Sequence, residues 1–196
     1  MPATLAPRSK GRPRDERRDD AITGAAVHEL ADHGFGRFAV EAVAERAGVA
    51  KTTVYRRFPS RTALLAAALE SLNEDLPDLP PPGPVRERLA LVLGALTTGQ
   101  VGVRMRILEQ AQASDDPTVL PLVDGLVIAP RRALVRAIVV DAVASGELRA
   151  GIDIDAALAC LVGPMLLLRS WRRVGCAGDL TPGDLLDVVL DGLGAR

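Results

Sequence analysis

The chain has 196 residues, 48% of them hydrophobic, which is enough apolar material for one large or two small domains. Charged residues make up 25%, a share typical of globular proteins, so wholesale disorder is excluded. With two cysteines and two histidines, the sequence excludes a disulfide framework and an all-cysteine zinc site, and we expect neither a metal nor another cofactor.

Residues 1–14 are predicted to form a flexible basic arm, because they hold three prolines and four basic residues without hydrophobic periodicity. Within the arm, Lys10-Gly11-Arg12-Pro13-Arg14 resembles an AT-hook core, whose extended Gly-Arg-Pro places arginine in the narrow minor groove of A·T-rich DNA. Arg12 and Arg14 would then contact DNA; a solvated basic tail is the alternative. No apolar stretch follows these charges, so we expect no signal peptide and a cytoplasmic protein.

Residues 15–76 are predicted to form a small helical module that meets a polyanion. Apolar residues recur at helical spacing from about Arg17 to Asp32, and Gly34 ends that helix. Residues 1–61 carry 12 Lys and Arg against 8 Asp and Glu, whereas residues 62–196 carry 12 against 17. This charge asymmetry favours a negatively charged partner for the first part of the chain.

Residues 40–58 have the spacing of a helix-turn-helix. A small residue lies where the second helix must cross the first, and a glycine four positions later can take the left-handed conformation of a tight turn. The predicted core consists of Val43, Ala44, Gly48, Val49, Val54 and Phe58. The second helix leaves donors for phosphate oxygens and base edges free of this core: Lys51, Thr52, Thr53, Tyr55, Arg56 and Arg57. An ordinary helical hairpin with a solvated face is the alternative.

Residues 77–196 are predicted to form a larger helical body. Its first segment, Pro77 to Pro84, holds five prolines and is a linker or a sharp corner. Helices are expected over about 130–144, from Asp153 or Asp155 to Arg173, and over 185–193 behind a Thr181 cap. The apolar run 156–168 has 13 residues, fewer than the about 20 of a membrane span, so we expect a buried core helix and no membrane. Since no segment alternates with period two, the fold is predicted to be all-α with about nine helices.

From Arg17 to Leu72 the sequence resembles the DNA-binding domain of the TetR-type (tetracycline-repressor-like) transcriptional regulators. The matching residues are His33-Gly34-Phe35, Val40-Glu41-Ala42-Val43-Ala44, Ala47-Gly48-Val49, Thr53-Val54-Tyr55, Phe58-Pro59-Ser60-Arg61 and Leu64-Leu65. The resemblance implies that 51–57 is the recognition helix, with Lys51 and Thr52 facing bases, and Thr53, Tyr55 and Arg56 facing phosphates or base edges.

The resemblance further implies that Ser60 caps the next helix and that Arg61 meets the DNA backbone. Ala39 and Ala50 stand where the family usually has Ser or Thr, so the two motif helices each lose an N-cap worth about 1 kcal/mol.

For the whole chain, the resemblance implies a ligand-responsive repressor that binds a palindromic operator as a homodimer and is released by a small molecule. We expect residues 154–193 to hold the dimer together, since two reading units on two half-sites require two copies. The central helices would enclose the effector pocket, with plausible lining residues Met105, Leu108, Leu126, Ile138, Met165 and Trp171. No catalytic constellation is present, so we expect no enzyme. A helical protein–protein adaptor without DNA binding is the alternative.

Overall fold

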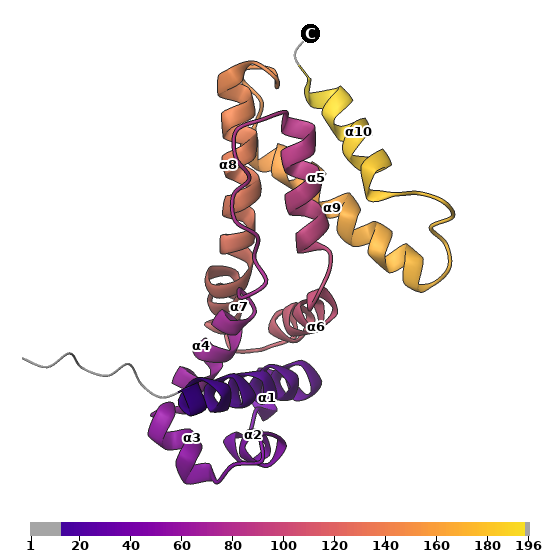
Figure 1. Cartoon of the computed structure of the whole chain (residues 1–196). Helices are drawn as coiled ribbons and strands as arrows, with labels where there is room; N and C mark the ends of the chain where they lie inside the picture. Colours follow the sequence, from indigo (N-terminus) through magenta and orange to yellow (C-terminus); the bar gives the residue numbers. More distant parts are fainter. Residues whose placement is uncertain (1–12, 195–196) are drawn as a thin grey trace, which may run out of the picture.

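The structure is a computed structural model that describes residues 13–194, a range in which helices are joined by loops (Figure 1). In chain order the helices are α1 (Pro13–Arg37), α2 (Val40–Arg46), α3 (Lys51–Arg57), α4 (Arg61–Ser71), α5 (Val85–Leu96), α6 (Val101–Gln112), α7 (Val119–Val123), the π-helical segment η1 (Asp124–Ile128), α8 (Ala129–Ser145), α9 (Ile154–Arg173) and α10 (Pro182–Leu193). Because α7, η1 and α8 follow without a break, the described residues hold nine helical runs, and the predicted all-α fold is confirmed.

The N-terminal arm is shorter than predicted, because α1 already begins at Pro13. Proline suits the first position of a helix, where its missing N–H would have no intrahelical partner. Pro13 and Arg14, which we predicted to belong to the flexible arm, belong to α1, so the end of the AT-hook core lies in a helix. Lys10, Gly11 and Arg12 lie outside the described residues, and the minor-groove contact of Arg12 stays a prediction.

Helices α1–α4 form the base of the molecule, in which α1 packs against α2, α4 and the body helix α6 (Figure 1). Gly34 interrupts the helical geometry of α1 with φ 74° and ψ 177°, a conformation that is almost confined to glycine. A Cβ there would also lie 2.4 Å from Oε1 of Gln110 in α6. Gly34 therefore ends the regular part of α1, as predicted, and also lets α6 approach closely.

The proline-rich segment 77–84 is an extended connection and not a sharp corner (Figure 1). Just before it, Asp75 accepts from Arg131 in the first turn of α8 at 3.4 Å. Just after it, the Val85 N–H donates to Glu147, beyond the last turn of α8, at 2.8 Å. The segment thus spans the length of α8, because its five prolines exclude a helix and favour extended chain.

The buried side chains form two clusters that do not divide at this connection. The first unites α1–α4 with Ile107, Ala111, Val119, Val123 and Val127 from α6, α7 and η1. The second unites α5, α8, α9 and α10. We predicted a base of residues 15–76 and a separate body of residues 77–196, yet the core of the base is completed by residues of the body. The predicted boundary at residue 76 is therefore not a boundary between hydrophobic cores.

We expected α9 to be a buried core helix, but it is buried along one face only. Leu161 and Met165 lie in the second cluster, whereas Leu167 and Trp171 are 49% and 42% exposed. Among the described residues, α9 is the one helix long and apolar enough to cross a membrane, and 28% of its most apolar window is buried. The helix is longer than the 13-residue apolar run, and its bounds, Ile154–Arg173, agree with the helix predicted from Asp153 or Asp155 to Arg173.

Candidate nucleic-acid interface

Helices α2 and α3 are joined by a tight turn at Gly48, which adopts the left-handed conformation with φ 66°. The Gly48 N–H donates to the carbonyl of Glu45 at 3.1 Å, and the Val49 N–H donates to that of Ala44 at 3.0 Å. These two bonds form a Schellman motif, which satisfies the last carbonyls of α2. The turn of the helix-turn-helix is thus present at the glycine where the sequence predicted it.

The predicted helix-turn-helix residues pack into the first cluster. Val43, Ala44 and Val54 are at most 4% exposed, and the half-buried Val49 and Phe58 pack against the same cluster. These contacts fix the crossing of the two short helices. They therefore decide which side of α3 faces away from the protein.

The outward side of α3 carries the side chains that we predicted to contact DNA. Lys51, Thr52, Tyr55 and Arg56 are exposed, while Thr53 is half-buried. At 3.6 residues per turn, the four exposed residues lie within one arc of about 140°. Hydroxyl, ammonium and guanidinium groups on one arc are donors that phosphate oxygens and base edges accept.

Lys51 is tied to the neighbouring helix by an ion pair with Glu41 of α2. Hydrogen bonding to Glu41 raises the pKa of Lys51, and the same bond lowers the pKa of Glu41. The ammonium group also lies 5.7 Å from the centre of the Tyr55 ring. Lys51 is therefore one half of an ion pair and not an isolated cation.

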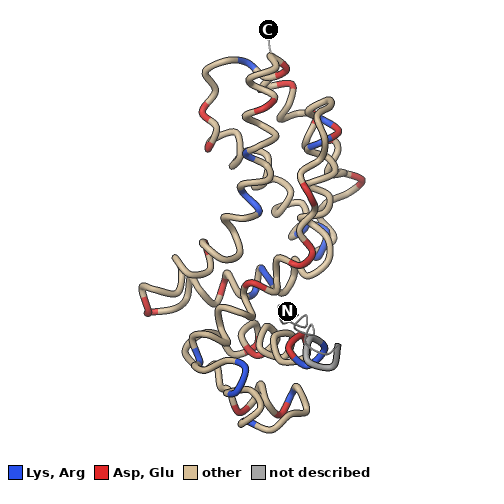
Figure 2. Tube along the Cα trace, turned by 60° about the vertical axis from the view of Figure 1, so that its left-hand side comes forward, with Lys and Arg blue, Asp and Glu red and all other residues tan. Residues whose placement is uncertain are grey.

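Acidic and basic residues both occur along the helices of the base (Figure 2), and further ion pairs join these helices. Arg46 of α2, for example, lies 3.2 Å from Asp32 of α1. The positive charge available to a polyanion is thus smaller than the count of lysines and arginines predicts.

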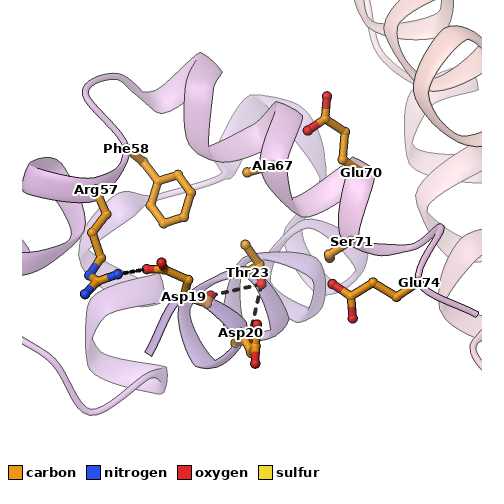
Figure 3. A pocket seen from close by; sticks show the side chains of 9 residues that line it. All are labelled: Asp19, Asp20, Thr23, Arg57, Phe58, Ala67, Glu70, Ser71 and Glu74. Carbon is orange, nitrogen blue, oxygen red and sulfur yellow. Dashed lines mark hydrogen bonds and ion pairs between the residues drawn. The ribbon is translucent and has the colours of Figure 1, made fainter. Parts of the chain in front are cut away.

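Arg57 departs from the prediction that it is free of the core. Its side chain is 15% exposed and pairs with Asp19 of α1 (Figure 3). Arg57 lies three positions after the buried Val54, so helical spacing places it on the inner side of α3. Sequence reasoning misassigned it because a charged residue at a helix end usually lies in solvent. Its predicted contact with DNA stays untested.

Behind Arg57 lies a hollow of about 510 Å³ between α1, α3 and α4 (Figure 3). Four of its lining residues are acidic: Asp19, Asp20, Glu70 and Glu74. In the described part of the chain, no three His, Cys, Asp or Glu side chains are placed to hold a metal ion. This acidic hollow repels a polyanion, whereas the exposed donors of α3 attract one.

The N-caps of the base agree with the sequence. Ala39 and Ala50 give α2 and α3 no side-chain cap, whereas the Ser60 hydroxyl accepts from the Ala63 N–H at 3.0 Å and caps α4. An uncapped start costs about 1 kcal/mol per helix, so packing of Val54 must hold α3 in place.

Arg61 has a structural role that sequence reasoning did not foresee. Its Nε donates to the Phe38 carbonyl at 3.2 Å, and its Nη2 donates to the Phe35 carbonyl. Its guanidinium lies 5.6 Å from the centre of the Phe38 ring. Arg61 thus ties the start of α4 to the end of α1, and its predicted contact with the DNA backbone stays a prediction.

A second cavity, of about 1210 Å³, lies in the body between α5, α6, the α7–α8 run and α9. Its volume exceeds the about 300–1,000 Å³ of common small-molecule sites. Most lining side chains are aliphatic or thioether groups, as in a site for an apolar ligand. The charged lining residues are Arg104, Arg131, Arg132, Arg136, Asp124 and Asp155.

The structure places three of the six predicted pocket residues at this cavity: Met105, Leu108 and Met165. The other three are corrections. Ile138 is fully buried in the second cluster, Leu126 packs against the first, and Trp171 is 42% exposed near the end of α9. Spacing showed which residues turn inward, but it cannot distinguish those that border a void from those that fill the core.

Sequence reasoning missed Arg131, which is 9% exposed at the cavity. Burial lowers its pKa to about 10, the charge of Arg104 adds to this effect, and Asp75 opposes it. The spacing contained a signal, because Arg131 precedes the buried Val135 by four residues and Ile138 by seven, and so shares their helix face.

Both parts of the chain match family models. Residues 22–68 match the model described as "Bacterial regulatory proteins, tetR family". Residues 79–189 match the model described as "Tetracyclin repressor-like, C-terminal domain". The first match contains α2, α3 and the turn between them, and the second contains the cavity.

Curated relatives agree with these matches. The chain is 29% identical over 188 residues to the DNA-binding transcriptional repressor TetR of Mycobacteroides abscessus, which covers 90% of this chain and 94% of that protein. It is 28% identical over 159 residues to the uncharacterized HTH-type transcriptional regulator YdeS of Bacillus subtilis, covering 80% of each. Both relatives are named as regulators of transcription.

Solved structures show the same fold. The fatty acid degradation regulator FadR from Bacillus halodurans superposes with a TM-score of 0.72 at 18% identity, over 96% of this chain and all of that chain. FadR from Bacillus subtilis, solved in complex with stearoyl-CoA, superposes with a TM-score of 0.64 at 20% identity, over 87% of this chain and 95% of that chain. At such identities the likeness concerns the fold alone.

Proposed function

The chain belongs to the tetR family of bacterial regulatory proteins, and we propose that it is a cytoplasmic repressor. As a homodimer it binds a palindromic operator, and it leaves the operator when a small molecule enters the body cavity. The coarser function follows from the family itself: the protein is a helix-turn-helix regulator of transcription that binds DNA. The observation that carries the proposal is the outward arc of α3 on a base whose core continues into a body with a large apolar cavity. No specific observation favours the alternative of an adaptor without DNA binding.

In this proposal α3 lies in the major groove. Lys51 and Thr52 face base edges, whereas Tyr55 and Arg56 contact phosphates, which position the protein without reading sequence. A symmetric dimer places its two recognition helices about 34 Å apart, one turn of the duplex, or a multiple of that distance.

Selection of genomic DNA fragments by the full-length protein tests this reading. We expect an inverted repeat, with log affinity falling linearly as log salt concentration rises, since phosphate contacts release counterions. Capture of fragments without a shared motif, or affinity without salt dependence, would contradict it.

The second copy is expected to cover the apolar faces of α9 and α10, within residues 154–193. Leu167 and Trp171 of α9 and Val188 of α10 are 49%, 42% and 72% exposed in the protomer. The two helices pack against each other, so their exposed faces are neighbours. Two such pairs related by a two-fold axis form a four-helix bundle that removes the faces from water.

Leu167→Glu is expected to convert the dimer to a monomer and to weaken operator binding, because it places a charge in the proposed apolar interface. Sedimentation at micromolar concentration measures the change. Leu91→Glu is the control, since Leu91 on α5 is 65% exposed but lies outside the proposed interface. A wild-type protein that sediments only as a 20.7 kDa species would refute the interface.

Glu41→Gln is expected to strengthen DNA binding and to steepen its salt dependence. The substitution removes the carboxylate that pairs with Lys51, so the ammonium group adds its full positive charge inside the groove and releases more of the counterions condensed on the DNA. Binding titrations at several salt concentrations measure both quantities. Glu45→Gln, an exposed glutamate on the same helix, controls for the loss of one negative charge. Equal slopes for the two variants would show that Lys51 does not reach DNA.

The effector is expected to be a largely aliphatic small molecule, because apolar side chains dominate the cavity wall. A ligand releases DNA only if it prefers the conformation that does not fit the operator. To lower the population of the DNA-binding conformation from about 99% to about 1%, the ligand must bind the other conformation more tightly by about 5.5 kcal/mol. Operator DNA must then weaken ligand binding by the same factor by which the ligand weakens operator binding.

A further inference from the structure

The wall of the body cavity holds two buried guanidinium groups that share one carboxylate. Arg104 and Arg131, each under 10% exposed, lie 2.8 Å and 3.4 Å from the oxygens of Asp75. One carboxylate cannot neutralise two guanidinium groups, so one unit of positive charge remains in a largely apolar wall. Within the described residues, the buried Nε of Arg131 also has no acceptor.

The other charged residues of the cavity do not carry this excess. Arg132 lies 3.6 Å from Asp124, and Arg136 lies 2.9 Å from Asp155. Each of these arginines is about half exposed and has its own carboxylate. The unmatched charge therefore lies where Arg104 and Arg131 meet Asp75.

The same two arginines hold the end of α4. Arg131 donates to the carbonyl of Leu72, the C-cap of α4, and to Oδ1 of Asn73 at 2.7 Å. The side-chain amide of Asn73 donates to the Leu126 carbonyl at 2.8 Å. Because α4 follows the recognition helix α3 after three residues, these contacts connect the cavity wall to the part of the base that positions α3.

Resting on the proposed function, we infer that the effector is an amphiphile with one anionic head group and an aliphatic tail, and that its head displaces Asp75 from Arg104 and Arg131. The tail lies against the apolar wall formed by residues such as Leu93, Leu158 and Met165. An anionic head cancels the excess charge, whereas a neutral head leaves it and a cationic head increases it.

The exchange releases the end of α4. Asp75 is already 38% exposed, so it can turn into solvent once a ligand anion takes its place. Asp75 then loses its ion pairs to Arg104 of α6 and Arg131 of α8, while α4 keeps its contacts with α1. The end of α4 shifts relative to α6 and α8, the shift is passed along α4 to α3, and the two recognition helices of a dimer no longer match the groove spacing.

Calorimetric titration of the full-length dimer tests the inference. The titrants are straight-chain carboxylates of about eight to eighteen carbons, and each is compared with the primary alcohol of the same length. We expect the carboxylates to bind at least tenfold more tightly than the alcohols and to release operator DNA. Arg104→Gln should abolish this preference. Arg106→Gln should keep it, because Arg106 lies on the same helix, is half exposed and does not line the cavity.

Asp75→Asn provides the sharpest comparison. It breaks the same ion pair as Arg104→Gln, so a purely structural role predicts that both variants weaken ligand binding. Competition instead predicts opposite effects: Asp75→Asn tightens carboxylate binding several-fold and lowers the concentration that releases DNA, whereas Arg104→Gln weakens both.

Weaker carboxylate binding by both variants, equal affinity for carboxylates and alcohols, or no binding of any carboxylate would overturn the inference. Operator binding without ligand is measured in parallel and tests the proposed function by itself. If alcohols and carboxylates release the operator equally well, the proposed repressor function holds and only the anion site is refuted.

Discussion

Thr52→Ala is expected to change the base preference at one position of each half-site and to weaken binding to the preferred operator by more than tenfold. Thr52 lies on the outward arc of α3, where a hydroxyl and a methyl group can both contact a base edge. One such contact discriminates by about 1–3 kcal/mol, and a symmetric dimer loses it twice, so the expected total is about 2–6 kcal/mol.

Two control variants separate the recognition of base sequence from the general affinity for DNA. Tyr55→Phe keeps the ring that lies beside Lys51 but removes the hydroxyl, and should weaken all sequences alike because a phosphate contact carries no sequence information. Thr98→Ala, an exposed threonine between α5 and α6, should change neither quantity. Selection of randomised duplexes measures the preference. An unchanged selected site for Thr52→Ala, with a changed one for Tyr55→Phe, would reverse the assigned roles.

Ile107→Ala is expected to lower the free energy of unfolding by about 2–5 kcal/mol and to destabilise the DNA-binding base, although the residue lies on α6 of the body. Ile107 is fully buried in the cluster formed mainly by α1–α4. The substitution leaves a cavity there that the surrounding helices fill only in part, so the base loses stability together with its support.

Hydrogen exchange of the Val54 amide in α3, measured together with chemical denaturation, tests this coupling. Leu186→Ala is the matched control, because Leu186 is equally buried but lies in the second cluster on α10. We expect Ile107→Ala to speed exchange at Val54 more than Leu186→Ala does at equal loss of global stability. Equal acceleration by both variants would mean that the two clusters unfold as one unit.

The sequence by itself determined the helix-turn-helix of α2 and α3. A small residue at 44, a glycine at 48 and hydrophobic residues at 49, 54 and 58 satisfy local rules of turn geometry and helical spacing, and the structure builds the predicted turn from them. Capping is equally local, so the absent caps at Ala39 and Ala50 and the present caps at Ser60 and Thr181 could all be read from neighbouring residues. The all-α class followed because helical periodicity needs no knowledge of distant contacts.

The tertiary structure alone decided which charges are available and what the inward residues touch. Arg57 and Lys51 both look like free cations in the sequence, but residues 38 and 10 positions earlier supply their carboxylates. Periodicity marked Ile138 and Met165 alike as inward residues, yet one fills the core and the other borders the cavity. The sharing of Asp75 by Arg104 and Arg131, and the completion of the base by Ile107, arise for the same reason. Helical spacing specifies the face of a helix, whereas its neighbours depend on how helices distant in sequence pack together.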